Sequence, residues 1–242
     1  MNDLLLTIAN LDFSPLYISL KTGIVATIIS YFLGVHIAGK VYCMKCPAKA
    51  VWDGILTLPM VLPPTVAGFI LLVVFSRRRP LGAFLYENMN IKVVQSWLGC
   101  VIAATIIALP IMYRNARAAF EQVDINIVYA AKTLGMPDRR VFRKVLLPAA
   151  RPGISSGIVL CFARAMGEYG ATSMLAGNIP GKTATVSQKI AMVVQDGDYN
   201  TAGIWSAIVL TIGFIIIVLT NIFIEKGNNN RSHNGKIENR NK

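Results

Sequence analysis

Residues 123–148 read VDINIVYAAKTLGMPDRRVFRKVLLP. The first part, 123–133, can form a helix, after which Gly135 suits a helix C-terminus, Pro137 the first turn of a new helix and Asp138 its positive end. Four basic side chains follow, interleaved with apolar ones. The pattern predicts a short amphipathic helix that either lies on lipid or fits a groove of a partner protein.

This stretch belongs to a 39-residue polar segment, 114–152, which is much longer than two neighbouring helices need as a connection. Apolar segments long enough to cross a bilayer as helices lie on both sides of it and elsewhere in the chain. They cover residues 16–38, 55–75, 93–113, 153–176 and 201–224. With 54% apolar residues, 15% charged residues and a mean hydropathy of +0.54, the chain is not an ordinary soluble domain. We expect an all-α polytopic membrane protein with about five transmembrane helices.

The net charge of +12 would suggest a nucleic-acid partner in a soluble protein, but its distribution indicates membrane topology instead. Sixteen Lys and Arg residues lie in segments 40–53, 114–152 and 225–242, against six in segments 1–15, 76–92 and 177–200. The positive-inside rule then predicts a short extracytoplasmic N-terminal segment, 1–15, and a cytoplasmic C-terminus. The tail, 225–242, has too few apolar residues to bury and is expected to be disordered.

The spacing in the long loop resembles a known signature, E-A-A-x3-G-x9-I-x-L-P, of binding-protein-dependent ABC importer permeases. Ala130-Ala131, Gly135 and Leu147-Pro148 match it, while Tyr129 stands in place of the Glu and Val145 in place of the Ile. The resemblance implies a type I ABC importer permease fold, with a transmembrane domain over 16–224 and a cytoplasmic coupling helix that docks on an ATPase. The implied coupling residues are Ala130, Ala131, Gly135, Met136, Pro137, Val141, Phe142, Val145, Leu147 and Pro148.

Two apolar segments, 58–68 and 162–171, are similar to the molybdate/sulfate branch of these permeases, and residues 178–183 look most like its molybdate members. The resemblance implies a permease subunit of the bacterial cytoplasmic membrane that passes an oxyanion, with molybdate preferred and sulfate or tungstate as alternatives. Its implied partners are two ABC ATPase subunits that bind MgATP, an extracytoplasmic molybdate-binding protein and a second copy of itself. An ion-coupled secondary transporter is the alternative from another class, and no nucleic acid is expected.

Charges and prolines lie inside two of the expected spans. Arg164 and Glu168, at i and i+4, share one helix face, so they form either a structural ion pair or part of an anion pathway. Pro59, Pro63 and Pro64 remove backbone donors from the second span, which predicts either a static kink or a flexing gate.

The remaining motifs are weaker. Arg77, Arg78 and Arg79 fall outside in the predicted topology, as a tolerated interfacial cluster or a docking patch for an anion or its carrier. Residues 177–183, GNIPGKT, resemble a nucleotide-binding loop but lack one residue between the glycines, so we expect no ATP site and no cofactor in this chain. Cys43 and Cys46 lack a second ligand pair, so no metal site is expected. No catalytic constellation is present in the sequence, which favours a transport subunit over an enzyme.

Overall fold

The computed structural model describes residues 11–45 and 47–238, with side chains through Val218 and at Ile222. Over these ranges the chain is helical with connecting turns and contains no strand, which confirms the predicted all-α class. The first part of the expected N-terminal segment, 1–10, and Cys46 lie outside the described residues. The helices are α2 (Ser14–Tyr42), α3 (Ala48–Val61), α4 (Pro64–Phe75), α5 (Pro80–Met89), α6 (Trp97–Glu121), α7 (Ile125–Thr133), α8 (Asp138–Val141), the π-turn η1 (Phe142–Leu146), α9 (Leu147–Ala149), α10 (Arg151–Met166), α11 (Gly170–Ala176), α12 (Val186–Gln195) and α13 (Tyr199–Glu238).

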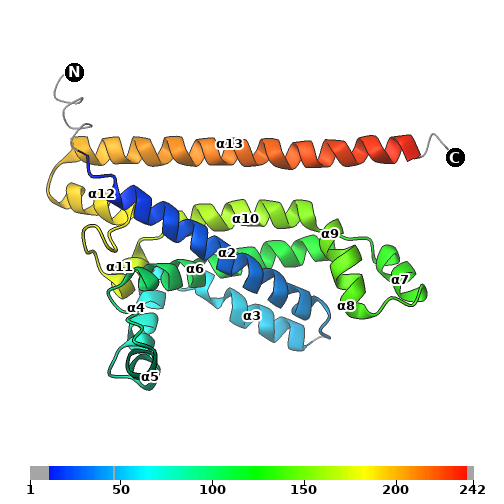
Figure 1. Ribbon diagram of the computed structural model, residues 1–242, viewed down its shortest axis with the longest axis horizontal. Helices are drawn as coiled ribbons and strands as arrows, with labels where there is room; N and C mark the ends of the chain where they lie inside the picture. The colour runs from blue at the N-terminus through cyan, green and yellow to red at the C-terminus, as the bar shows by residue number, and fades with distance from the viewer. Residues whose placement is uncertain (1–10, 46, 239–242) are drawn as a thin grey trace.

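Helices α2, α6 and α10 form the centre of the molecule (Figure 1). Their contacts are made largely by small side chains, and Ala26, Ala38, Ala104 and Ala108 are completely buried. A Cβ added at Gly34 of α2 would come within 3.0 Å of Met112 of α6. Small residues let helix backbones approach closely, which is the usual packing solution where lipid offers no hydrophobic driving force between helices.

Three helices, α2, α6 and residues 199–218 of α13, are long and apolar enough to span a membrane. The predicted second span, 55–75, is not one helix, because α3 and α4 are bent by 106° at the break between them. Leu62 is extended, with ψ of 138°, and neither Pro63 nor Pro64 can donate the backbone hydrogen bond that would continue the helix. In Figure 1, α3 runs along the central helices while α4 turns away across them.

The predicted fourth span, 153–176, is also divided. Helix α10 ends at Met166, residues 167–169 form a break, and α11 begins at Gly170. Helix α10 is preceded by a further bend of 71° from residues 138–149. The sequence pattern located the apolar stretch, but the break at Gly167, Glu168 and Tyr169 was not predicted, because these residues were assigned to one continuous helix.

Helix α13 is longer than the predicted span, 201–224. It continues as a helix to Glu238, where the composition predicted a disordered tail from residue 225. The segment contains no proline, and adding residues to an existing helix costs much less than starting one, so the polar sequence can extend it. Residues 239–242 lie outside the described part of the chain.

Candidate functional site: the coupling loop, the helix breaks and two polar clusters

The long loop folds as two short helices separated by a tight turn, as its sequence predicts. The Asp124 side chain accepts a hydrogen bond from the Asn126 amide, 2.9 Å, and begins α7. Gly135 has φ of +76°, and its N–H bonds to the Lys132 carbonyl at 2.9 Å, which closes the helix. Pro137 lies one residue earlier than expected, just before α8 rather than in its first turn.

The turn is braced by an ion pair between Lys132 and Asp138, 2.8 Å apart. The hydrogen bond from the Lys132 ammonium to Asp138 raises the pKa of Lys132. Both side chains are exposed, so the pair contributes little to stability but favours the relative orientation of α7 and α8.

One face of the loop packs into the chain's own core. Phe142 makes an edge-to-face contact with Phe120 of α6, with ring centroids 5.5 Å apart. A Cβ added at Gly39 of α2 would lie 2.6 Å from the Phe142 ring, so a larger residue at position 39 would displace that ring. Of the predicted coupling residues, those on this inner face are Ala131, Met136, Val141, Phe142, Val145 and Leu147.

The other face is exposed. Ala130, Gly135 and Pro137, from the predicted set, share it with Tyr129 and Leu134, which was not predicted. Leu134 is 83% exposed although it is apolar. These five residues form what we call the coupling surface. The sequence did contain a signal for Leu134. It is an apolar residue directly before the glycine that ends a helix, and it falls on the apolar face of neither helix.

A basic depression of about 430 Å³ adjoins the coupling surface. It is lined by Pro137, Arg139, Arg140, Arg143 and Lys144. After it the helix widens into a π-turn, in which the Leu147 N–H bonds to the Phe142 carbonyl. The wide turn precedes Pro148, which has no amide proton for a regular helical bond.

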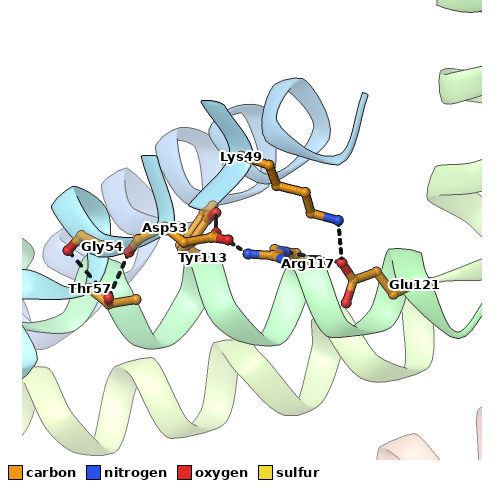
Figure 2. Close-up of polar contacts among 7 residues, drawn as sticks. All are labelled: Lys49, Asp53, Gly54, Thr57, Tyr113, Arg117 and Glu121. Carbon is orange, nitrogen blue, oxygen red and sulfur yellow. Dashed lines mark hydrogen bonds and ion pairs between the residues drawn. The ribbon is translucent and has the colours of Figure 1, made fainter. Parts of the chain in front are cut away.

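A polar cluster that sequence analysis missed joins α3 to α6 (Figure 2). The Asp53 carboxylate accepts the Tyr113 hydroxyl and pairs with Arg117, and Arg117 Nε lies 3.1 Å from Glu121. Lys49 Nζ reaches Glu121 at 2.8 Å. We call these five residues the α3–α6 network. Its sequence signal was polar residues at i, i+4 spacing: Lys49 and Asp53, then Tyr113, Arg117 and Glu121.

The α3–α6 network attaches helix α3, which makes few other packing contacts with the rest of the chain. No residue of α3 is buried, and apart from Leu56, which packs partly buried against the core, its large apolar side chains are exposed. They include Val51, Trp52, Ile55, Leu58, Met60 and Val61. The position of α3 in the single chain therefore depends strongly on Asp53 and Lys49.

The predicted pair of charges inside the fourth span is present and spans the break between α10 and α11. Arg164 Nη1 lies 2.6 Å from one carboxylate oxygen of Glu168, and the other oxygen accepts the Ala171 amide at 2.8 Å. Glu168 is only 2% exposed, while about one-third of the Arg164 side chain is exposed. Glu168 thus connects the end of one helix to the start of the next.

The two helix breaks lie against each other. A Cβ at Gly170 would come within 3.1 Å of Pro64 and 3.2 Å of Thr65. Farther along, a Cβ at Gly68 of α4 would lie 2.6 Å from the Ala171 Cα of α11. Pro64 and Thr65 therefore meet the segment that carries Glu168, whereas Pro59 lies inside α3 without ending it.

The other predicted residues lie apart from these features. Arg77, Arg78 and Arg79 are exposed in the connection between α4 and α5. The loop 177–183 is held by a hydrogen bond within itself, in which Thr183 Oγ1 accepts the Ile179 amide at 2.9 Å. Cys43 is exposed, and the described residues contain no group of three or more His, Cys, Asp or Glu that could hold a metal ion.

Comparison with known proteins gives a consistent result. Residues 26–225 match the family model described as "Binding-protein-dependent transport system inner membrane component". The molybdenum transport system permease protein ModB of Escherichia coli K12 is 40% identical over 76% of this chain and 80% of its own length. The sulfate transport system permease protein CysT of Salmonella typhimurium is 32% identical over 84% of this chain and 73% of its own.

The fold is also found among solved structures. A bacterial ABC transporter involved in the import of the acidic polysaccharide alginate superposes with a TM-score of 0.77, over 93% of this chain and 83% of that one, at 11% identity. At this identity the likeness extends to the fold alone. It agrees with the predicted type I importer permease architecture.

Proposed function

The chain belongs to the family of binding-protein-dependent transport system inner membrane components, and from this premise we propose that it is the permease subunit of a molybdate importer. The chain is a multi-pass permease of an ABC importer for molybdate or sulfate, because its relatives are permeases of this kind. The observation that favours molybdate is the higher identity to the molybdenum permease, 40%, than to the sulfate permease, 32%. Sulfate is the second candidate and tungstate a third.

We propose that each of two ABC ATPase subunits docks on the coupling surface of one permease copy. Leu134, Tyr129 and Ala130 supply exposed apolar area at the tip of the loop, which a groove on the partner can bury. The inner face of the loop is fixed to α2 and α6 through Phe142, so displacement of the tip is passed to the central helices. MgATP would be bound by the partner, not by this chain.

The translocation pathway would form between two copies of the chain. The exposed apolar face of α3 and the break at Pro63 and Pro64 are the surfaces that a second copy would cover. Two broken helices in contact are suited to a gate, since a small rotation at either break moves the other. The Arg164 side chain, one-third exposed, would either present positive charge to the passing anion or only stabilise the break.

Reconstituted transport tests the cargo. The permease would be assembled with an ABC ATPase and an extracytoplasmic oxyanion-binding protein from the same organism, in liposomes loaded with MgATP on the ATPase side. Uptake of radiolabelled molybdate would be measured against unlabelled sulfate and tungstate. We expect ATP-dependent molybdate uptake that excess sulfate does not suppress. Uptake of labelled sulfate in preference to molybdate would overturn the molybdate assignment. Uptake by the permease alone, abolished by a protonophore, would favour a secondary transporter.

A further inference from the structure

A cavity of about 550 Å³ lies at the C-terminal end of α4, between that helix, α5 and the strap 90–96 that leads to α6. Its polar lining comes from Ser76, Arg77, Arg78, Lys92 and Gln95, and its floor is apolar. No acidic residue lines it, and no carboxylate of the described residues pairs with Arg77, Arg78 or Lys92. Three uncompensated positive charges therefore surround one hollow.

The cavity is a built structure and not only a gap beside a basic loop. Gly82 of α5 packs so closely beneath the Phe75 and Ser76 carbonyls that an added Cβ would overlap both oxygens. The Arg77 guanidinium is seated 3.8 Å from the centre of the Tyr86 ring. The Ile91 amide donates to the Leu85 carbonyl at 3.0 Å and the Gln95 amide to the Leu175 carbonyl of α11 at 3.1 Å. The strap is thus fixed at both ends.

The strap also contains two residues with a left-handed backbone conformation. Asn90 and Gln95, with φ of +53° and +56°, are the non-glycine residues with positive φ among those the structure describes. Asn90 is the left-handed C-cap of α5, a position that asparagine commonly takes, whereas a left-handed glutamine is uncommon. Gln95 is itself part of the cavity lining.

From these observations we propose that the cavity is a binding site for a tetrahedral oxyanion group, distinct from the helix breaks. Arg78 and Lys92 supply charge-assisted donors, Ser76 and Gln95 neutral ones, and Arg77 fixed positive potential. The group could come from a free oxyanion or from the phosphate of an anionic phospholipid, because both present the same charged oxygens. Through the Gln95–Leu175 bond, occupancy would stabilise the contact between the strap and α11.

Binding can be measured without transport, so the outcome is independent of the cargo assigned above. The full-length chain, delipidated in maltoside detergent, would be dialysed against labelled molybdate and, separately, sulfate. In the second arm, native mass spectrometry would detect phosphatidylglycerol retained by or added to the same preparation. The variants are Arg78→Gln/Lys92→Gln, Arg78→Lys, which keeps the charge, and the matched control Arg79→Gln, since Arg79 does not line the cavity. Thermal unfolding of each variant checks that it is folded.

We expect binding in at least one arm, weakened about tenfold or more in the double variant and retained in Arg78→Lys and Arg79→Gln. Binding in the dialysis arm identifies a free oxyanion as the source, and binding only in the second arm identifies a phospholipid. The proposal is overturned if neither arm gives binding, or if the double variant binds as well as the wild type. Equal loss in Arg79→Gln would overturn it too, because general surface charge would then explain the effect.

Discussion

At the scale of single residues, the sequence signature of the coupling loop combines two different roles. Its spacing correctly predicted the turn at Gly135, because helix-ending glycines have a local conformational signal. It did not separate Phe142, which packs inside this chain, from Ala130, which is exposed, because that depends on where α2 and α6 lie. Leu134, the most exposed large apolar residue of the loop, lies between the signature positions and was missed.

We expect Leu134→Asp and Phe142→Ala to fail in different ways. Leu134→Asp should leave the permease at normal level and thermal stability, because its side chain contacts almost nothing, but should abolish ATPase binding and uptake. Phe142→Ala should lower the stability by roughly 2–4 kcal/mol, since a partly buried aromatic ring is lost. Membrane protein level, unfolding temperature and co-purified ATPase distinguish them. Normal ATPase binding by Leu134→Asp would contradict the coupling surface.

The pair Arg164 and Glu168 permits a second test. Glu168→Ala leaves the Ala171 amide unpaired and Arg164 without its counter-charge, so we expect reduced protein level, with a cost of about 1–3 kcal/mol. If the pair is structural, the double variant Arg164→Ala/Glu168→Ala should recover part of that level and of uptake. If Arg164 serves the anion pathway, Arg164→Gln should lose uptake at normal protein level. Immunoblotting with labelled-anion uptake measures both quantities.

At the scale of helices, apolar periodicity located the membrane segments but not their interruptions. Pro63 and Pro64 predicted a bend, since neither residue carries an amide proton. They did not predict its angle of 106°. The angle follows from the packing of α4 on α11 at Gly68 and Ala171, a contact between segments far apart in the chain. The break before α11 contains no proline; Gly167 caps the end of α10, and the buried bond from the Ala171 amide to Glu168 holds the start of α11.

The attachment of α3 through the α3–α6 network leads to a prediction about mobility. Asp53→Asn and Arg117→Gln each remove a charge that links α3 to α6, so hydrogen exchange of α3 amides should increase by about tenfold while that of α2 stays unchanged. Arg114→Gln is the matched control, because Arg114 lies on the same helix and beside the same cluster without joining it.

Unchanged exchange in Asp53→Asn would mean that α3 is held by other contacts. Should α3 exchange increase in the control as well, the effect would belong to the general charge of α6 and not to the network. In the assembled importer, the same variants should raise ATP hydrolysis that is not linked to uptake, if α3 acts in the gate.

At the scale of the whole molecule, charge asymmetry predicts which side faces the cytoplasm. Cys43 provides a natural reporter for this side, since it is exposed at the end of α2 whereas Cys100 and Cys161 are buried. In a Cys46→Ser background, a membrane-impermeant maleimide should label Cys43 in inside-out vesicles and not in intact spheroplasts. In an Arg79→Cys variant, the new cysteine should be labelled in intact spheroplasts, because position 79 is predicted to lie on the opposite side of the membrane. Labelling of Cys43 from outside would invert the predicted topology.

The exposure of Leu134 has a consequence for synthesis. A permease made without its ATPase would present this leucine, beside a basic depression, to the aqueous phase. Exposed apolar tips are features that proteases and chaperones recognise, and they favour aggregation. Cells that produce the permease in excess of its partner should therefore degrade the surplus, so that the amount of importer is set by whichever subunit is scarcer.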